Sequence, residues 1–506
     1  DNTVRDHHTV YAVSKVRNEN KGKMPVWASV LCLAVIVVGF GMLVSLVWPV
    51  KGQDEGSKTA LEDMTDTEIV DMLLKEMCQD EEVDLQESLP EETSTYSEYC
   101  QIYHPGYSAV AYDSEEQVLY YNNILLVHLL DQLSEQEKQQ LADLAGGEIV
   151  GYISGAMEIL QVKVPAQDAA SLEQCAQKLM ENEHVLYAST DGPIGIENCD
   201  EDNNPWCGSN ENPESDKGNV GNPGGNDWWA EAIDAYGGWE YTKYAEPIKV
   251  AVIDSGFSEN HEDMDIHMMN ENQADNHGTH VAGLIAAKNN SVGIRGVADQ
   301  AELIGIDWQQ NDTSLLEHCS FLAFLSEAVR QGCKVVNMSF GIHQLSYREY
   351  VLSGEEITNM ISNALDGQYE LYLKRLKTSC KTSVRWCMAA MVNLHVQGYD
   401  DYLLVQSAGN GIDNGEGVGL GAQQNGFFIS LDGSYYTECL LTYTEKVRKI
   451  IENAGGYQYF SGRILGVGAV KNDRNNQGYY KMRESSNYGP QVGICAPGED
   501  IYSTLA

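Results

Sequence analysis

The feature that most constrains the fold is an alternation of short apolar runs with helix-like stretches after Asp227. The runs are nearly continuous in apolar residues, as expected for parallel strands that are covered on both faces. They read KVAVID, ELIGID, KVVNMSF, YLLVQSAG, RILGVGAV and VGICAP. Because parallel strands are joined by long and usually helical crossovers, the alternation predicts a doubly wound, mostly parallel α/β sheet over residues 227–506.

A different pattern covers residues 118–195, where strand and helix signals follow the order strand, helix, two strands, helix, strand. The strand candidates are VLYYNNILLVHL, GEIVGYI, MEILQVKV and HVLYAS, and the helix candidates are SEQEKQQLADLAG and DAASLEQCAQKLMENE. This order predicts a small α+β domain of the ferredoxin-like, split βαβ type. A domain of this size has a thin core and gains stability from packing against a partner.

An uncharged stretch, residues 26–47, is long enough to cross a bilayer as a helix. A signal peptide would be shorter and would end at a small-residue cleavage site, whereas this stretch continues into Trp48 and Pro49. A buried core helix would show a polar stripe, which is missing here. Basic residues precede the stretch and acidic ones follow it, so we predict a cytoplasmic tail (1–25), a transmembrane anchor (26–48) and an extracytoplasmic remainder on the cell membrane.

Two segments have the composition of linkers. Residues 49–117 are rich in Asp and Glu and predict an acidic stalk. Residues 196–226 are rich in Asn, Asp, Gly and Pro and have few apolar residues to bury, which predicts an exposed linker that proteases can cut.

The charge and the cysteines limit the possible partners. The net charge is −43, with 32 Lys and Arg against 75 Asp and Glu. This balance argues against nucleic acid as a partner, because phosphate binding requires clustered basic side chains. Twelve cysteines are present, one of them in the predicted anchor, and the odd number outside cannot all pair. Because no C-x-x-C occurs, the sequence predicts no metal site of the zinc type.

Two candidate functional residues lie where apolar runs end, which is where functional side chains gather in a doubly wound sheet. Asp254 closes KVAVID, and Asn410 follows YLLVQSAG directly. Alone, Asp254 is equally a turn former or a helix cap, and Asn410 is equally an ordinary Asn-Gly turn. A side-chain amide at Asn410 is also suited to donate a hydrogen bond to an oxyanion.

A histidine and a short strand end complete the set of candidates. His277 begins the run HGTHVAG, whose small residues let a helix pack closely, and a zinc site formed with His280 would lack a third ligand. The segment made of Ser339, Phe340 and Gly341 would offer a strand edge with which an extended peptide can pair. By itself this segment is only the end of a strand.

Taken together, D-S-G, H-G-T-H-V-A-G, N-M-S-F-G and S-A-G-N-G in this order resemble the subtilisin family of serine proteases. The resemblance covers residues 227–506 and implies a doubly wound α/β protease that hydrolyses peptide or protein substrates. It implies that Asp254 is the charge-relay aspartate, His277 the general base and Asn410 the oxyanion-hole residue. His280 matches a second, structural histidine.

The resemblance also bears on the preceding domain and on cofactors. Residues 118–195 are similar to the inhibitory propeptides of this family, which implies that the chain carries its own intramolecular inhibitor. No cofactor is required for catalysis. A structural calcium ion is compatible with an acidic, secreted relative, although no calcium-binding loop can be recognised in the sequence.

One expected motif does not occur in the sequence. The family places its nucleophile in G-T-S-M-A, shortly after a segment like APGEDIYSTLA, with which this sequence closes at Ala506. We expect that the sequence is a fragment, that the serine lies beyond Ala506, and that the chain as given is inactive. The alternative is a catalytically silent, membrane-tethered protein that binds peptides.

Overall fold

The computed structural model describes two groups of residues, which are residues 91–197 except 114–117, and residues 228–505 with gaps. In the second group it describes residues 228–242, 246–290, 292–308, 315–343, 384–410, 428, 431, 433–474, 478–499, 501 and 503–505. The predicted cytoplasmic tail and anchor lie outside the described residues, as do most of the predicted stalk and linker. Among the described residues, no helix combines the length and apolar character needed to span a bilayer.

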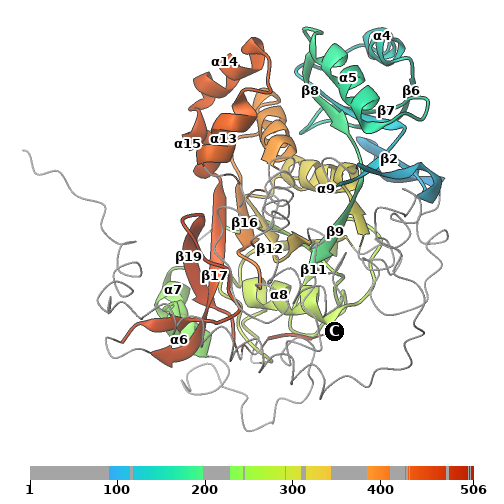
Figure 1. Cartoon of the computed structure of the whole chain (residues 1–506). Helices are drawn as coiled ribbons and strands as arrows, with labels where there is room; N and C mark the ends of the chain where they lie inside the picture. The colour runs from blue at the N-terminus through green and yellow to red at the C-terminus, as the bar shows by residue number, and fades with distance from the viewer. Residues whose placement is uncertain are drawn as a thin grey trace, which may run out of the picture.

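The C-terminal unit (residues 228–505) is built on an eight-stranded sheet that is mostly parallel (Figure 1). Seven strands follow the order β11-β12-β10-β14-β16-β17-β18, and β19 also pairs with β17. Only the β17–β18 pair is antiparallel. The strands are β10 (Lys249–Asp254), β11 (Ile266–Met268), β12 (Glu302–Asp307), β14 (Val335–Met338), β16 (Leu403–Ser407), β17 (Ile464–Arg474), β18 (Tyr480–Met482) and β19 (Val492–Pro497). The predicted parallel sheet is confirmed.

Helices cover both faces of this sheet because successive side chains of a strand point to opposite sides. On β10, Val252 packs with α8 (Asn276–Ala286), whereas Ile253 shares a core with α9 (His318–Arg330) and with the helical residues 384–396. The other helices of this unit are α6 (Trp228–Ala232), α7 (Ala235–Thr242), α13 (Gly433–Leu440), α14 (Glu445–Ala454) and α15 (Tyr457–Ser461).

The N-terminal unit (residues 91–192) contains the predicted strand and helix order. It consists of β5 (Ile124–Leu129), α4 (Glu135–Ala145), β6 (Glu148–Ile153), β7 (Ile159–Lys163), α5 (Ala169–Met180) and β8 (Val185–Thr190). The strands pair as β6-β7-β5-β8, which gives one antiparallel sheet with α4 and α5 packed on one face. Helix α4 begins with a capping box between Ser134 and Glu137, which explains its sharp start.

Two sequence predictions for this unit were wrong in part. The final portion of the predicted stalk forms β1 (Glu91–Ser97), β2 (Cys100–Pro105), a short 3-10 turn (Tyr107–Ala109) and β3 (Val110–Asp113). The β1–β2 hairpin extends the sheet at β6, because Cys100 and Ile102 are buried there. The run VLYYNNILLVHL is two strands, since a turn at residues 122–123 separates β4 (Val118–Tyr121), which pairs with β3, from β5.

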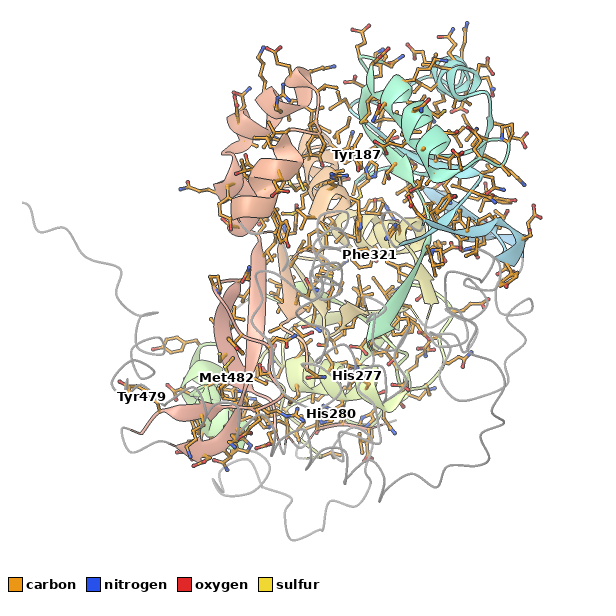
Figure 2. All side chains as sticks on the ribbon, viewed as in Figure 1. Tyr187, His277, His280, Phe321, Tyr479 and Met482 are labelled. Carbon is orange, nitrogen blue, oxygen red and sulfur yellow. The ribbon has the colours of Figure 1, made fainter. Side chains whose placement is uncertain are left out.

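The two units share one hydrophobic core. The sheet face opposite α4 and α5 presents Leu126 and Tyr187, and these residues belong to the same buried cluster as Phe321 and Phe324 of α9 (Figure 2). The hairpin adds an edge-to-face contact, since the rings of Tyr96 and Phe324 lie 5.2 Å apart. The small N-terminal unit therefore completes its core with the helices of its neighbour.

Candidate active site

Asp254 and His277 meet at the carboxyl-end edge of the parallel sheet. Asp254 is the last residue of β10, and His277 is the second residue of α8. The His277 Nδ1 atom lies 2.5 Å from Asp254 Oδ1, and the Asp254 side chain is almost fully buried while that of His277 is 23% exposed. The backbone N–H of Ser255 also donates to Asp254 Oδ1, at 2.8 Å. The structure thus joins two sequence-predicted residues from separate motifs.

The position of His277 depends on Asp275, which sequence reasoning missed. Asp275 is the N-cap of α8, and its Oδ1 accepts hydrogen bonds from His277 N at 2.7 Å and from Ser255 Oγ at 3.0 Å. This carboxylate therefore ties the first turn of α8 to the end of β10. An Asp directly before the periodic run was the available signal, because Asp is a preferred N-cap residue.

His280, the second histidine of the motif, has a structural environment. Figure 2 shows His277 and His280 together on α8. The His280 Nε2 atom lies 3.1 Å from the Ile501 carbonyl oxygen, and Ser503 Oγ donates to the His280 carbonyl at 2.7 Å. His280 thus helps to fasten Ile501 and Ser503 against α8.

Asn410 is exposed and follows β16 at the same edge of the sheet. Strand β14 separates β16 from β10, and all three run parallel. With strands about 5 Å apart, the end of β16 is roughly 10 Å from the end of β10. Asp254 and Asn410 therefore lie at the same edge of the sheet, on strands separated by β14.

The segment of residues 339–341 is only partly a strand edge. Ser339 and Phe340 lie between β14 and β15 (Gly341–His343), outside both strands. Ser339 Oγ accepts a hydrogen bond from the Asn337 amide at 2.9 Å, and the buried Phe340 ring packs 6.1 Å from that of Trp308. Of the three residues, only Gly341 takes part in strand pairing.

The strand that pairs with Gly341 comes from an earlier part of the chain. β9 (Pro193–Glu197) follows β8 directly and lies antiparallel between β15 and β13 (Leu315–Glu317). Gly341 faces Glu197, and Glu317 faces Pro193. Residues 196–197, which the sequence assigned to the linker, thus belong to β9. An extended segment of the chain occupies a slot between two strands, as a bound peptide would.

A metal site can be considered only at one loop. Within the described ranges, no group of three or more His, Cys, Asp or Glu side chains is arranged to hold a metal ion. Asp263 is fully buried, and its Oδ2 accepts from Ile294 N at 2.9 Å, while its Oδ1 has no hydrogen-bond partner in the described part of the chain. Burial raises the pKa of this carboxyl. A Cβ atom on Gly293, whose φ is +55°, would lie 2.3 Å from Asp263 Oδ2, so the loop wraps closely around the carboxylate.

Comparison with known proteins identifies the family of this chain. The model of the subtilase family matches residues 246–505, just over half of the chain. The chain therefore belongs to the subtilase family, whose members are serine peptidases of the subtilisin type.

Individual relatives match parts of the chain that differ in length. The chain is 34% identical to the minor extracellular protease Epr of Bacillus subtilis over 123 residues, which is 22% of this chain and 19% of Epr. It is 37% identical to subtilisin E of the same species over 103 residues, covering 19% of this chain and 27% of that protein. With subtilisin DY of Bacillus licheniformis, identity is 22% over 51% of this chain and 66% of the relative. The matches to Epr and subtilisin E thus span about a quarter of their length or less.

The solved structures similar to this chain include fervidolysin from Fervidobacterium pennivorans, a keratinolytic enzyme related to subtilisin. Its alignment covers 76% of this chain and 48% of fervidolysin, at 18% identity and a TM-score of 0.41.

Proposed function

We propose that this chain is the Asp-His part of a serine endopeptidase that cleaves extended peptide segments. The observation that carries the proposal is the buried Asp254 carboxylate 2.5 Å from His277 Nδ1, beside a slot that holds a peptide strand. Asp254 would hold one tautomer of His277 and stabilise the imidazolium. The Nε2 atom of His277 would then take the proton of an attacking serine, which we propose lies outside this sequence. Asn410 would donate to the oxyanion of the tetrahedral intermediate.

We propose that the N-terminal unit, predicted from residues 118–195, is the inhibitory propeptide of this peptidase. Its last strand, β8, is separated only by Asp191 and Gly192 from β9, which fills the slot between β13 and β15. A substrate needs the same backbone hydrogen bonds that β9 already makes, so it cannot enter while β9 is in place. Cleavage in the predicted linker would allow the unit to leave.

We propose a structural calcium ion beside Asp263. The buried Oδ1 of Asp263 lacks a hydrogen-bond partner among the described residues, and the same loop carries Asn290, whose side-chain oxygen accepts from Val292 N at 2.9 Å. Oxygen ligands with a single carboxylate suit Ca²⁺, a hard cation. The ion would stabilise the loop after α8 and has no part in the chemistry.

The location of the enzyme is a further proposal. Residues 26–48 would anchor the chain in the cell membrane, with the N-terminus in the cytoplasm and the peptidase outside. The apolar length of this stretch and the basic residues before it support the assignment.

The test is to express the complete reading frame, let the product mature, and measure hydrolysis of unstructured casein with and without a serine-directed phosphonate. The proposal predicts hydrolysis that the phosphonate abolishes, together with covalent labelling of one serine. A correctly folded, matured product that neither cleaves casein nor reacts would support the alternative, a silent and membrane-tethered peptide-binding protein.

A further inference from the structure

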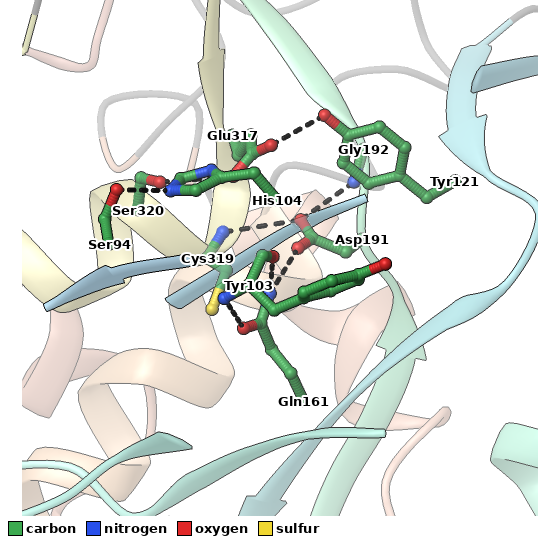
Figure 3. Close-up of polar contacts among 10 residues, drawn as sticks. All are labelled: Ser94, Tyr103, His104, Tyr121, Gln161, Asp191, Gly192, Glu317, Cys319 and Ser320. Carbon is green, nitrogen blue, oxygen red and sulfur yellow. Dashed lines mark hydrogen bonds and ion pairs between the residues drawn. The ribbon is translucent and has the colours of Figure 1, made fainter. Parts of the chain in front are cut away.

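Two buried carboxylates face each other across the contact between the two units. Glu317 ends β13 in the C-terminal unit, and Asp191 follows β8 in the N-terminal unit. Only 8% of Glu317 and 1% of Asp191 is exposed. Figure 3 shows the polar contacts around them. Burying two neighbouring carboxylates costs free energy unless each is neutralised.

Glu317 has a cationic partner from the other unit. Its Oε2 lies 2.6 Å from His104 Nδ1, on β2, and accepts from Ser320 Oγ at 3.3 Å. Its Oε1 accepts from Tyr121 OH at 2.8 Å. A protonated His104 therefore offsets the charge of Glu317 when the units are docked.

Asp191 has only neutral donors. Its Oδ1 accepts from Gly192 N at 2.8 Å and from Cys319 N at 3.4 Å, in the first turn of α9. Its Oδ2 accepts from the Gln161 amide at 3.4 Å. These bonds hold the side chain in place without neutralising a negative charge.

We propose that docking of the N-terminal unit takes up protons at Asp191 and His104, so that the inhibitory unit is held at mildly acidic pH and released as the pH rises. The proposal rests on the inhibitory role proposed above for this unit. It adds a condition for release that depends on named residues at the contact.

The expected pKa values agree with this geometry. Burial, and then the charge of Glu317, raises the pKa of Asp191 to about 7. Burial alone would lower the pKa of His104, but the hydrogen bond and charge of Glu317 outweigh it and raise that pKa, helped by the charges of Glu92 and Asp191. In the separated units both groups would be hydrated, with pKa values near 4 and 6.5.

The direction of the pH effect on docking follows from the difference between the docked and free pKa values. Both pKa values are higher in the docked state, so their contribution to docking is complete below the free pKa values and is lost as the pH rises through the docked ones. Burial raises the pKa of the other titratable groups that face the carboxylates, so they stay neutral in this range. These groups are Tyr96, Tyr121 and Cys319.

One buried histidine opposes this effect at lower pH. His128 on β5 is fully buried at the contact and faces Tyr187, 6.0 Å away between ring centres. Beyond Tyr187 lie Tyr443 and, from the helical residues 384–396, the charged Arg385. Burial lowers the pKa of His128 to about 3. Below about pH 6.5 the imidazole of a hydrated His128 binds a proton that it must lose when the units dock, so His128 weakens docking there. Release is therefore expected above pH 6.5, with little change below.

The experiment uses the full chain in detergent, with a site for a sequence-specific protease inserted between residues 205 and 220. After cutting, the dissociation constant of the N-terminal fragment is measured at pH 6, 7 and 8. For the wild type we expect the constant to rise with pH. For one group with a docked pKa near 7, the contribution between pH 6 and 8 is about tenfold. The rise should therefore be about tenfold smaller in Asp191→Asn, which cannot ionise.

Two further variants make the result specific. Asp143→Asn removes an exposed carboxylate on α4 and should keep the wild-type rise. His104→Gln should weaken docking at pH 6 and reduce the rise, which tests the proposal even if Asp191→Asn does not fold. An unchanged rise in both interface variants, or a dissociation constant that falls with pH, would overturn the proposal. A fragment that separates at every pH would overturn it together with the inhibitory role, while the casein assay decides the peptidase function separately.

Discussion

Gly278 of α8 approaches the carbonyl oxygen of Gly256 so closely that a Cβ atom on Gly278 would lie 2.1 Å from it. The two glycines belong to separate sequence motifs, D-S-G and H-G-T. Gly256 also has a φ of +71°, which favours glycine. Their contact sets the start of α8 against the end of β10, and this places His277 beside Asp254. Backbone packing therefore accounts for a glycine in each motif.

Replacing Gly278 with alanine should destabilise the chain, because the new methyl group meets backbone atoms that cannot move aside. Overpacking of this kind costs roughly 1–3 kcal/mol. The matched control is Gly238→Ala, since Gly238 lies exposed on α7 with no atom near the position of its Cβ. Urea unfolding should show the loss for Gly278→Ala only. Equal midpoints for the two variants would show that the close contact is not rigid.

His128→Leu should flatten the acid dependence of stability. The unfolded chain protonates His128 below about pH 6.5, but the folded chain does so only near pH 3, because the ring is buried. Above pH 6.5 the protonation of His128 takes nothing from the free energy of unfolding. As the pH falls toward 3 that free energy decreases, by about 2 kcal/mol at pH 5. Urea unfolding at pH 7.5 and 5 measures the difference. A control with the exposed His267→Leu should behave as the wild type, and an unaltered difference in His128→Leu would refute this explanation.

Removal of calcium should lower the thermal unfolding midpoint if Asp263 holds the ion. A ligand that binds only the folded state stabilises it by mass action, by about 2.7 kcal/mol at one hundred times its dissociation constant. Asp263→Asn should abolish the effect of a chelator. Asp265→Asn, which removes a largely exposed carboxylate paired with Lys288, should preserve it. Equal sensitivity of wild type and Asp263→Asn to the chelator would place any calcium elsewhere.

Asn410→Ala should lower turnover of the matured enzyme by about 100- to 1000-fold, with a smaller effect on KM, because an oxyanion donor acts mainly in the transition state. Steady-state kinetics with a peptide substrate test this. Asn472→Ala, at an exposed position of β17, is the matched control and should be neutral. A loss in KM alone would mean that Asn410 binds the substrate in its ground state.

The sequence was sufficient for elements whose pattern is local. Continuous apolar runs predicted the parallel strands, and the position of Asp254 at the end of one run predicted its place at the edge of the sheet. The hairpin of residues 91–105 was missed because EETSTYS has no apolar alternation and is held by its partner strand.

Contacts between distant segments could not be predicted from the sequence. Nothing in the residues PIGIE of β9 indicates that they pair with β13 and β15, which lie more than a hundred residues further along the chain. The contact between Asp191 and Glu317 has the same origin, since it exists only when the two units dock. An Asp directly before the helical run is a local signal for a helix cap at Asp275. Its hydrogen bond with Ser255 depends on the fold and could not be predicted from the sequence.

The role of His277 is tested by the rate of casein hydrolysis by matured His277→Ala, made from the complete reading frame. A general base at His277 predicts a fall in turnover of about 10⁶-fold, the loss known for removal of the subtilisin histidine, with substrate binding largely retained. His267→Ala, an exposed histidine on β11, should keep full activity. A His277→Ala enzyme that hydrolyses casein at a rate close to that of the wild type would contradict the assignment of His277 as the general base.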